Sequence, residues 1–207
     1  FFISFSSKTK AQEIKLGLYS GITSSSLKSN VFGIEARGNN IFGIEGGIHA
    51  DLALRKWLKL HTEVGFIQKG GEAGILEFRN NYLELRASPV YYLNLKKWTL
   101  FGGVGIAVGY SLSPKEEIVN NSQFPPETTI TRQSWNFSGI AKVGFEINFS
   151  NSNLFFQTIY SPALTNSNSF QIINNDPSPS PDDPDVFTAE YENRTFSFSI
   201  GIKKIIK

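Results

Sequence analysis

The stretch Trp135-Asn-Phe-Ser-Gly-Ile-Ala-Lys-Val-Gly-Phe-Glu-Ile-Asn-Phe149 indicates the fold of this chain. Its odd positions carry apolar or small side chains, whereas its even positions include Asn136, Lys142 and Glu146. A period of two places alternate side chains on opposite faces of a β-strand. The stretch therefore predicts one long strand with an apolar face and a charged face.

The same alternation recurs along the whole chain of 207 residues, which is long enough for about one domain. Eight segments of this kind lie at about 13–21, 42–56, 58–69, 79–95, 98–112, 133–149, 153–165 and 193–206. The 18 Phe residues, together with many Val, Ile, Thr and Tyr residues, suit a pleated surface. No continuous apolar run reaches the length of a membrane-spanning helix. The chain is therefore predicted to be all-β.

The connections between these segments alternate in length. They are very short at 56–57, 96–97 and 150–152, and longer at 22–41, 70–78, 113–132 and 166–192. In an up-and-down meander alternate connections lie at the same end, so one end carries tight turns and the other carries long loops. Outer-membrane barrels have this asymmetry. We therefore predict an eight-stranded antiparallel up-and-down transmembrane β-barrel.

The apolar face is predicted to contact lipid. The interior of an eight-stranded barrel is just wide enough for its own side chains, and the apolar face carries too many large residues to fit there. Much of the glycine falls on the polar face, where a narrow interior requires small residues. Aromatic residues also gather near the predicted strand ends, as interfacial belts require, at Trp57, Tyr82, Tyr91, Trp98, Tyr110, Trp135 and Tyr160. A soluble, lipocalin-like carrier with an apolar interior is the alternative.

The composition excludes several classes of function. The 20 Lys and Arg residues and 18 Asp and Glu residues are scattered, so no basic stripe is available for nucleic acid. The absence of Cys excludes disulfide scaffolds, thiolate nucleophiles and Cys-ligated zinc. Because His49 and His61 are the only histidines, a metal site with several imidazoles would need carboxylates to complete it. We expect neither a metal nor a cofactor.

The charged face is predicted to line the lumen. Its members are Lys15, Glu45, His49, Asp51, Arg55, Lys59, His61, Glu63, Glu84, Arg86, Lys142, Glu146 and Lys203. Charges in so narrow a space must pair or be hydrated, because an isolated buried ion is costly. We expect a charge network that seals and rigidifies the barrel. The alternative is a proton or ion path through His49, Asp51, His61 and Glu63.

The sequence gives little support for catalysis. His61 and Glu63 with a nearby serine would suit a hydrolase, but the alternation places them on the polar face, away from a lipid substrate. Ser88 and Ser138 also fall on this face, and nothing pairs either of them with a base. No catalytic residue is predicted, and a lipid-modifying barrel enzyme remains an alternative.

Two segments are expected to lie outside the barrel wall. Residues 1–12 are expected to be either the tail of an export signal or a disordered N-terminus, and the barrel domain is expected over residues 13–207. Residues 174–185 contain four prolines and four aspartates, which predicts an extended, solvated loop. This loop is either passive or a partner-facing arm. A Ca²⁺ site at its aspartates is disfavoured, because prolines oppose the turn that such a site needs.

Several short motifs resemble the small PorT-like outer-membrane β-barrels of Bacteroidetes. They are Phe42-Gly-Ile-Glu-Gly-Gly-Ile48, Asn81-Tyr-Leu-Glu-Leu-Arg86, Phe101-Gly-Gly-Val-Gly105, Phe155-Phe-Gln-Thr-Ile-Tyr-Ser161 and Phe196-Ser-Phe-Ser-Ile-Gly-Ile-Lys203. The resemblance implies a barrel of the bacterial outer membrane, surrounded by lipid. With short turns in the periplasm and long loops outside, we expect both termini in the periplasm. It also implies a supporting role in secretion or envelope assembly, with envelope or secretion-system proteins as partners.

Overall fold

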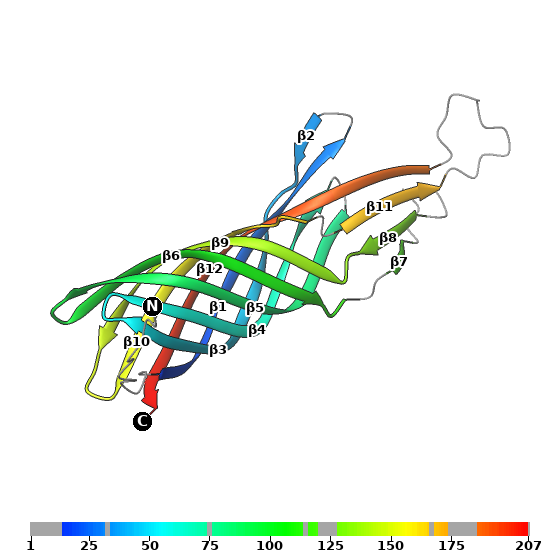
Figure 1. Ribbon diagram of the computed structural model, residues 1–207. Helices are drawn as coiled ribbons and strands as arrows, with labels where there is room; N and C mark the ends of the chain where they lie inside the picture. Colours follow the sequence, from blue (N-terminus) through cyan, green and yellow to red (C-terminus); the bar gives the residue numbers. More distant parts are fainter. Residues whose placement is uncertain are drawn as a thin grey trace, which may run out of the picture.

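The computed structural model describes residues 14–31, 34–73, 76–113, 116–119, 128–165, 168–173 and 186–206. Within these ranges the chain forms a closed antiparallel β-barrel (Figure 1). The eight barrel strands are β1 (Ile14–Val31), β3 (Ile41–Arg55), β4 (Leu58–Ala73), β5 (Leu76–Leu95), β6 (Trp98–Ser111), β9 (Trp135–Asn148), β10 (Ser152–Pro162) and β12 (Val186–Ile206). Each pairs with the next barrel strand along the chain, and β1 pairs with β12 to close the barrel. The predicted eight-stranded fold is confirmed.

Four short strands extend the barrel at one end. β2 (Ile34–Arg37) pairs with the last part of β1, and β11 (Asn168–Ile173) pairs with the first part of β12. β8 (Thr128–Arg132) then pairs with β11, and β7 (Glu116–Val119) pairs with β8. Figure 1 shows these strands projecting beyond the barrel wall. We call this the extension end and the opposite one the turn end.

The turn end carries the predicted short connections. β3 is joined to β4 through Lys56 and Trp57, and β5 to β6 through Lys96 and Lys97. Lys96 has a φ of 46°, the left-handed conformation that tight hairpin turns use. The register of β1 against β12 also places Ile14 beside Ile206 at this end.

Some strands are longer than predicted. β1 continues to Val31, so the expected loop over 22–41 is wrong for most of its length. The expected loop over 70–78 is also wrong, because β4 runs to Ala73 and β5 begins at Leu76. Beyond the apolar band the backbone ladder continues while the outward side chains become polar, so the alternation fades before the strand ends. The proline-rich segment 174–185 and residues 1–12 lie outside the described residues.

Burial follows the predicted alternation. In β9, Asn136, Lys142 and Glu146 are buried, whereas Phe137 and Val143 are 46% and 64% exposed. The polar face therefore lines the lumen and the apolar face forms the outer surface. The lipocalin-like alternative, which needs the opposite arrangement, is wrong. Among the described residues, no helix has the length and apolar character needed to cross a membrane.

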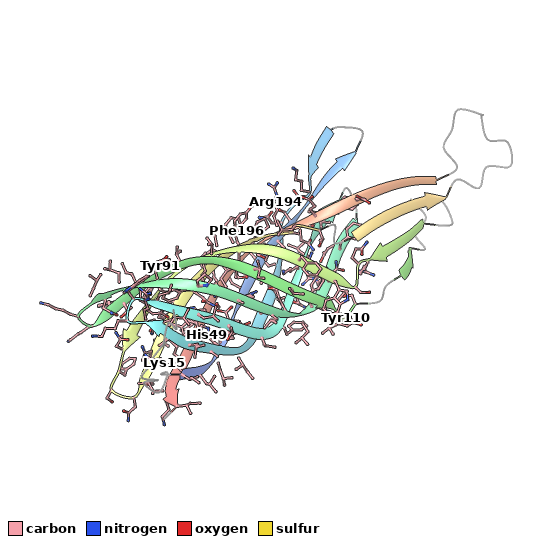
Figure 2. All side chains as sticks on the ribbon, in the orientation of Figure 1. Lys15, His49, Tyr91, Tyr110, Arg194 and Phe196 are labelled. Carbon is pink, nitrogen blue, oxygen red and sulfur yellow. The ribbon has the colours of Figure 1, made fainter. Side chains whose placement is uncertain are left out.

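Aromatic pairs mark both rims of the apolar surface. At the turn end Trp57 stacks on Tyr91 with ring centroids 5.4 Å apart, and at the extension end Tyr110 meets Trp135 at 5.1 Å. Figure 2 shows Tyr91 and Tyr110 at opposite ends of the barrel. Trp98 and Tyr110 are separated by about 40 Å along their strand, which is about 30 Å along the barrel axis for strands tilted as in membrane barrels. This spacing matches a bilayer.

Tyr82 was predicted to lie in an aromatic belt at the membrane interface, and this assignment is wrong. Tyr82 is fully buried in the lumen, because it shares the inward parity of Glu84 and Arg86 on β5. Further aromatic rings inside the barrel belong to Tyr19, Tyr92, Phe101 and Phe155.

Two inward glycines make room for these rings. A Cβ added at Gly144 would lie 2.4 Å from Cζ of Phe101, and one at Gly201 would lie 2.4 Å from Cζ of Phe155. The glycines predicted on the polar face thus permit large residues elsewhere on that face.

Candidate functional site

Arg86 on β5 joins three carboxylates inside the lumen. Its Nη2 donates to Oε2 of Glu45 at 2.8 Å, its Nε to Oε1 of Glu84 at 2.7 Å, and its Nη1 to Oε2 of Glu63 at 3.3 Å. All four side chains are buried. A planar guanidinium offers five donors in a fixed geometry, which suits several carboxylates at once. Arg86 therefore connects β5 to both β4 and β3.

Glu63 on β4 connects opposite walls of the barrel. Its Oε1 accepts from Nζ of Lys142 at 2.9 Å and from Nε2 of Gln157 at 3.0 Å. Lys142 lies on β9 and Gln157 on β10, and neither strand pairs with β4. Side chains of these three residues therefore span the lumen.

A second junction lies nearer the turn end. The ammonium group of Lys203 on β12 contacts Oδ2 of Asp51 and Oε1 of Glu146, both at 2.5 Å. Oε1 of Glu146 also accepts from the hydroxyl of Tyr92 at 2.8 Å, and Oε2 accepts from Asn153 at 2.9 Å. These contacts tie β3, β5, β9, β10 and β12 together.

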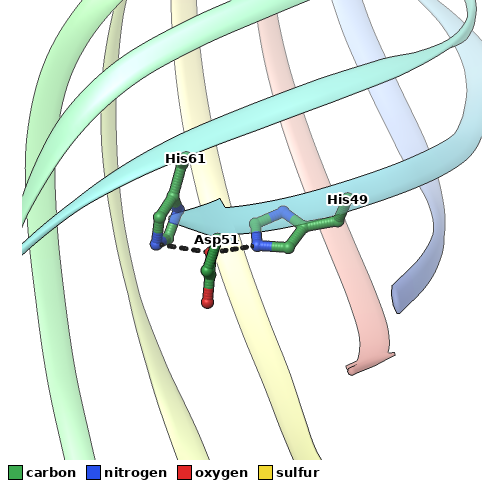
Figure 3. A group of neighbouring side chains, drawn as sticks. All are labelled: His49, Asp51 and His61. Atoms are coloured by element: carbon green, nitrogen blue, oxygen red, sulfur yellow. Dashed lines mark hydrogen bonds and ion pairs between the residues drawn. The ribbon is translucent and has the colours of Figure 1, made fainter. Parts of the chain in front are cut away.

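His49, Asp51 and His61 form a compact group between these junctions (Figure 3). Nε2 of His49 lies 2.6 Å from Oδ1 of Asp51, and Nε2 of His61 lies 3.1 Å from the same oxygen. Nδ1 of His49 faces Oε1 of Glu63 at 3.3 Å. Only a doubly protonated imidazole can donate to carboxylates from both ring nitrogens. The geometry therefore fits a His49 cation in the network.

The same three residues offer ligand atoms within 4.8 Å of one another, so they are the group that could hold a metal ion among the described residues. Two imidazoles and a carboxylate are a donor set that zinc accepts. However, the Lys203 ammonium group already occupies the other oxygen of Asp51. A divalent cation would have to displace or tolerate this charge, so the donor set fits a metal poorly.

The structure brings most of the predicted lumen residues into one network. Those linked by the contacts above are Glu45, His49, Asp51, His61, Glu63, Glu84, Arg86, Lys142, Glu146 and Lys203. Lys15 and Lys59 are half-buried near the turn end, and Nζ of Lys59 lies 4.0 Å from the Tyr92 ring centroid.

The assignment of Arg55 to the lumen is wrong. Its side chain is exposed, and its guanidinium lies 5.7 Å from the ring centroid of Trp57. Ala53 pairs with Lys59 but Arg55 pairs with Leu58, so the register shifts between them. A shift of one residue reverses the face to which later side chains point.

Two buried cations were not predicted. Lys69 forms an ion pair with Glu84, and Nε of Arg132 donates to Oδ1 of Asn80 at 2.7 Å. Counting in twos from Glu63 to Lys69 would have identified the first of them. Arg132 lay in an expected loop, where no alternation pointed to it.

The serines considered for catalysis do not engage a histidine. Ser88 pairs in register with His61, but among the described residues its hydroxyl has no hydrogen-bond partner. Ser138 donates to Asn136 at 3.1 Å. A nucleophile and its base must lie within hydrogen-bond reach, and neither serine meets this requirement.

The inner wall of β10 and β12 differs from the rest of the lumen. Among the described residues, the buried hydroxyls of Ser161, Ser197 and Ser199 have no protein partner. Buried polar groups of this kind are normally satisfied by water. The short side chains of Ser197 and Ser199 on β12 lie on the wall opposite β4 and β5, whereas Lys203 of the same strand and Gln157 of β10 extend into the charge network.

Together, the apolar exterior, the aromatic rims and the charged interior define a small integral outer-membrane β-barrel protein. The model of the outer membrane protein beta-barrel domain family matches residues 6–169. The chain belongs to this family, and its location is the bacterial outer membrane.

Several solved structures are similar to this chain, and Neisserial surface protein A shows the same fold. Neisserial surface protein A is 11% identical, with 91% of this chain and 96% of that chain covered and a TM-score of 0.52. Ail of Yersinia pestis is 14% identical, with 94% and 99% covered and a TM-score of 0.43. The outer-membrane protease OmpT of Escherichia coli is 11% identical, with 96% and 99% covered and a TM-score of 0.45. No curated protein matches the sequence.

Proposed function

We propose that this protein is a non-enzymatic structural barrel whose lumen is sealed by its charge network. The observation that carries the proposal is the position of Glu63, whose carboxylate meets Arg86 from β5, Lys142 from β9 and Gln157 from β10. Opposite charges in a poorly hydrated interior attract more strongly than at a surface. They therefore favour closure of the space over the lining of a channel.

The network also resembles a path for protons, because Glu63, His49, Asp51 and His61 are in contact one after another. Arg86 stands between Glu63 and Glu84 in the same chain of contacts. A guanidinium stays protonated in proteins and so cannot relay a proton. This position of Arg86 favours a seal over a conducting path.

The barrel is proposed to lie with its turn end in the periplasm, because outer-membrane barrels have short turns on that side. Its extension end then projects outward, with outer-membrane lipid around the apolar band. The motifs that resemble the PorT-like proteins of Bacteroidetes support a role in envelope assembly or secretion, with proteins of those systems as partners.

Conductance in a planar lipid bilayer tests the seal. We expect no steady open-channel conductance from the purified protein, while a larger water-filled porin conducts in the same bilayer. Stable conductance steps from the unmodified protein would contradict the proposal and favour ion transport.

An assay in lipid tests the absence of enzymatic activity. The protein is incubated in vesicles of phospholipid and lipopolysaccharide, and the acyl chains are followed by mass spectrometry. We expect unchanged lipids, because His61 is buried inside the lumen and no described serine is hydrogen-bonded to a histidine. Acyl transfer or hydrolysis that is lost in the His61→Gln variant would contradict the proposal.

A further inference from the structure

We propose that the outer surface of β1, β10 and β12 binds a lipid that carries a phosphate headgroup and an acyl chain. This inference concerns the membrane-facing surface, so it goes beyond the proposed sealing of the lumen. It does not depend on which end of the barrel faces the periplasm.

The headgroup site is a pocket of about 250 Å³ near the extension end, lined by both polar and apolar side chains. Arg194 on β12 lies directly across from Ser26 on β1. Lys28 lies two residues further along the same face of β1, directly across from Glu192. Ser24 and Asn40 also line the pocket. A guanidinium with hydroxyl and amide donors around it is a set of groups that can recognise a phosphate.

The guanidinium of Arg194 is available to bind an anion. Among the described residues its guanidinium forms no ion pair and no hydrogen bond, although the side chain is half-buried. A guanidinium can bind a phosphate through two parallel hydrogen bonds. Arg194 is therefore the principal headgroup ligand of this proposal.

The pocket lies at the level where lipid headgroups are found. Tyr160 and Phe196 form a ring pair with centroids 4.7 Å apart, and Arg194 follows Phe196 at the next outward position of β12. Figure 2 shows Arg194 and Phe196 close together where β12 leaves the barrel. Aromatic belts mark the boundary between hydrocarbon and headgroups. Arg194 lies about 7 Å beyond this pair along the strand.

The acyl-chain site is a hollow of about 630 Å³ on the barrel side of the same aromatic pair. Ile22, Phe198 and Thr158 lie in register directly next to the row formed by Ser24, Phe196 and Tyr160. Large side chains of Phe145 and Phe156 bound the hollow, whereas Ser20 and Thr158 are small. Small residues between large ones leave a groove that a hydrocarbon chain can fill.

The two sites share three strands and meet at one aromatic row. A lipid with its phosphate at Arg194 can therefore extend its chain toward the middle of the barrel without leaving this surface. Free phosphate would lack the chain, and a lipid with a choline headgroup would bring a positive charge toward Arg194 and Lys28. The arrangement thus favours an acylated lipid with a phosphate monoester.

Lipid titration of the full chain in non-ionic detergent tests the headgroup site. Phosphatidic acid is the probe, and bound lipid is measured by native mass spectrometry. We expect one saturable site whose affinity falls at least 10-fold in the Arg194→Gln variant. The Arg55→Gln variant, which removes an exposed cation near the turn end, serves as the matched control and keeps the full affinity. Equal binding by both variants would overturn the proposal.

Folding of each variant is checked by circular dichroism. If Arg194→Gln does not fold, Lys28→Gln is expected to weaken phosphatidic acid binding at least 3-fold. Unchanged affinity in a folded Lys28→Gln variant would then overturn the proposed headgroup site.

Two further ligands test the headgroup site and the acyl-chain groove separately. Phosphatidylcholine is expected to bind at least 10-fold more weakly than phosphatidic acid, and inorganic phosphate is expected not to compete at equal concentration. If phosphatidylcholine bound with the same affinity as phosphatidic acid, the proposed headgroup site would be wrong. If inorganic phosphate bound with the same affinity as phosphatidic acid, the proposed acyl-chain groove would be wrong.

The groove is also tested by filling it. Thr158→Phe places a ring in the hollow and should weaken phosphatidic acid binding at least 5-fold. Ala87→Phe adds the same ring to the outer face of β5, away from the groove, and should leave binding unchanged. Equal effects of the two substitutions would overturn the acyl-chain assignment.

Discussion

The lumen has two unlike walls. The wall formed by β4 and β5 carries long charged residues, among them Glu63, Lys69 and Arg86, whereas the stretch of β12 that precedes Lys203 carries the small hydroxyls of Ser197 and Ser199. The long side chains reach across the barrel, and the short ones leave them the room to do so. The comparison shows that a narrow barrel is filled by complementary walls and not by uniformly small residues. The predictions below test how much stability each part contributes.

The largest loss is expected at the charged wall. Arg86→Ala removes the guanidinium that pairs with Glu45, Glu63 and Glu84. Breaking buried pairs leaves uncompensated charges, so the free energy of unfolding should fall by about 3–5 kcal/mol. Reversible urea unfolding in lipid vesicles measures this loss. A loss below about 1 kcal/mol would show that the network is hydrated and weakly coupled.

The next largest loss of stability is expected when a charge is placed on the outer surface, and it should depend on how deep in the membrane the residue lies. Val104 is 66% exposed on β6, between the aromatic rims. Val104→Arg should cost about 2–4 kcal/mol, because a charge at mid-membrane is poorly solvated. Tyr110→Arg, at the rim, should cost no more than about 1 kcal/mol. Unfolding in lipid compares the two, and equal costs would contradict the lipid-facing assignment.

A smaller effect is expected where the lumen is packed around aromatic rings. Gly144→Ala would place a methyl group against the backbone oxygen of Phe156 and the Phe101 ring, and should cost about 1–3 kcal/mol through overpacking. Gly139→Ala is the matched control, because a Cβ there meets nothing within 4 Å. Thermal unfolding of the two variants in the same detergent measures the difference. If Gly139→Ala were the more damaging, the inward packing of Phe101 would be wrong.

The smallest effect is expected at the hydroxyl wall. Ser197→Ala removes a buried hydroxyl that has no partner among the described protein atoms. Since no protein hydrogen bond is lost, the free energy of unfolding should change by less than about 1 kcal/mol. The same urea experiment compares it with Arg86→Ala. A loss as large as that of Arg86→Ala would mean that both walls contribute equally.

The faces of the strands could be predicted because side-chain alternation is a local property of an extended backbone. Glu63, Lys142 and Glu146 were placed in the lumen by counting in twos, without any knowledge of the neighbouring strands. The same counting failed at Arg55, where a shift in register reverses the face. Tyr82 was misplaced for a different reason: it was assigned to the aromatic belt by its residue type, although its parity pointed inward.

By itself, the sequence determined the strand order, the charged interior and the apolar exterior, since each of these depends on neighbours along the chain. Only the tertiary structure decided which charges meet, because Glu63 and Lys142 are 79 residues apart and touch only when the barrel closes. It also decided the membrane-facing pocket. Ser24, Tyr160 and Arg194 become neighbours there through the registers of β1, β10 and β12, which strand pairing sets and no local pattern encodes.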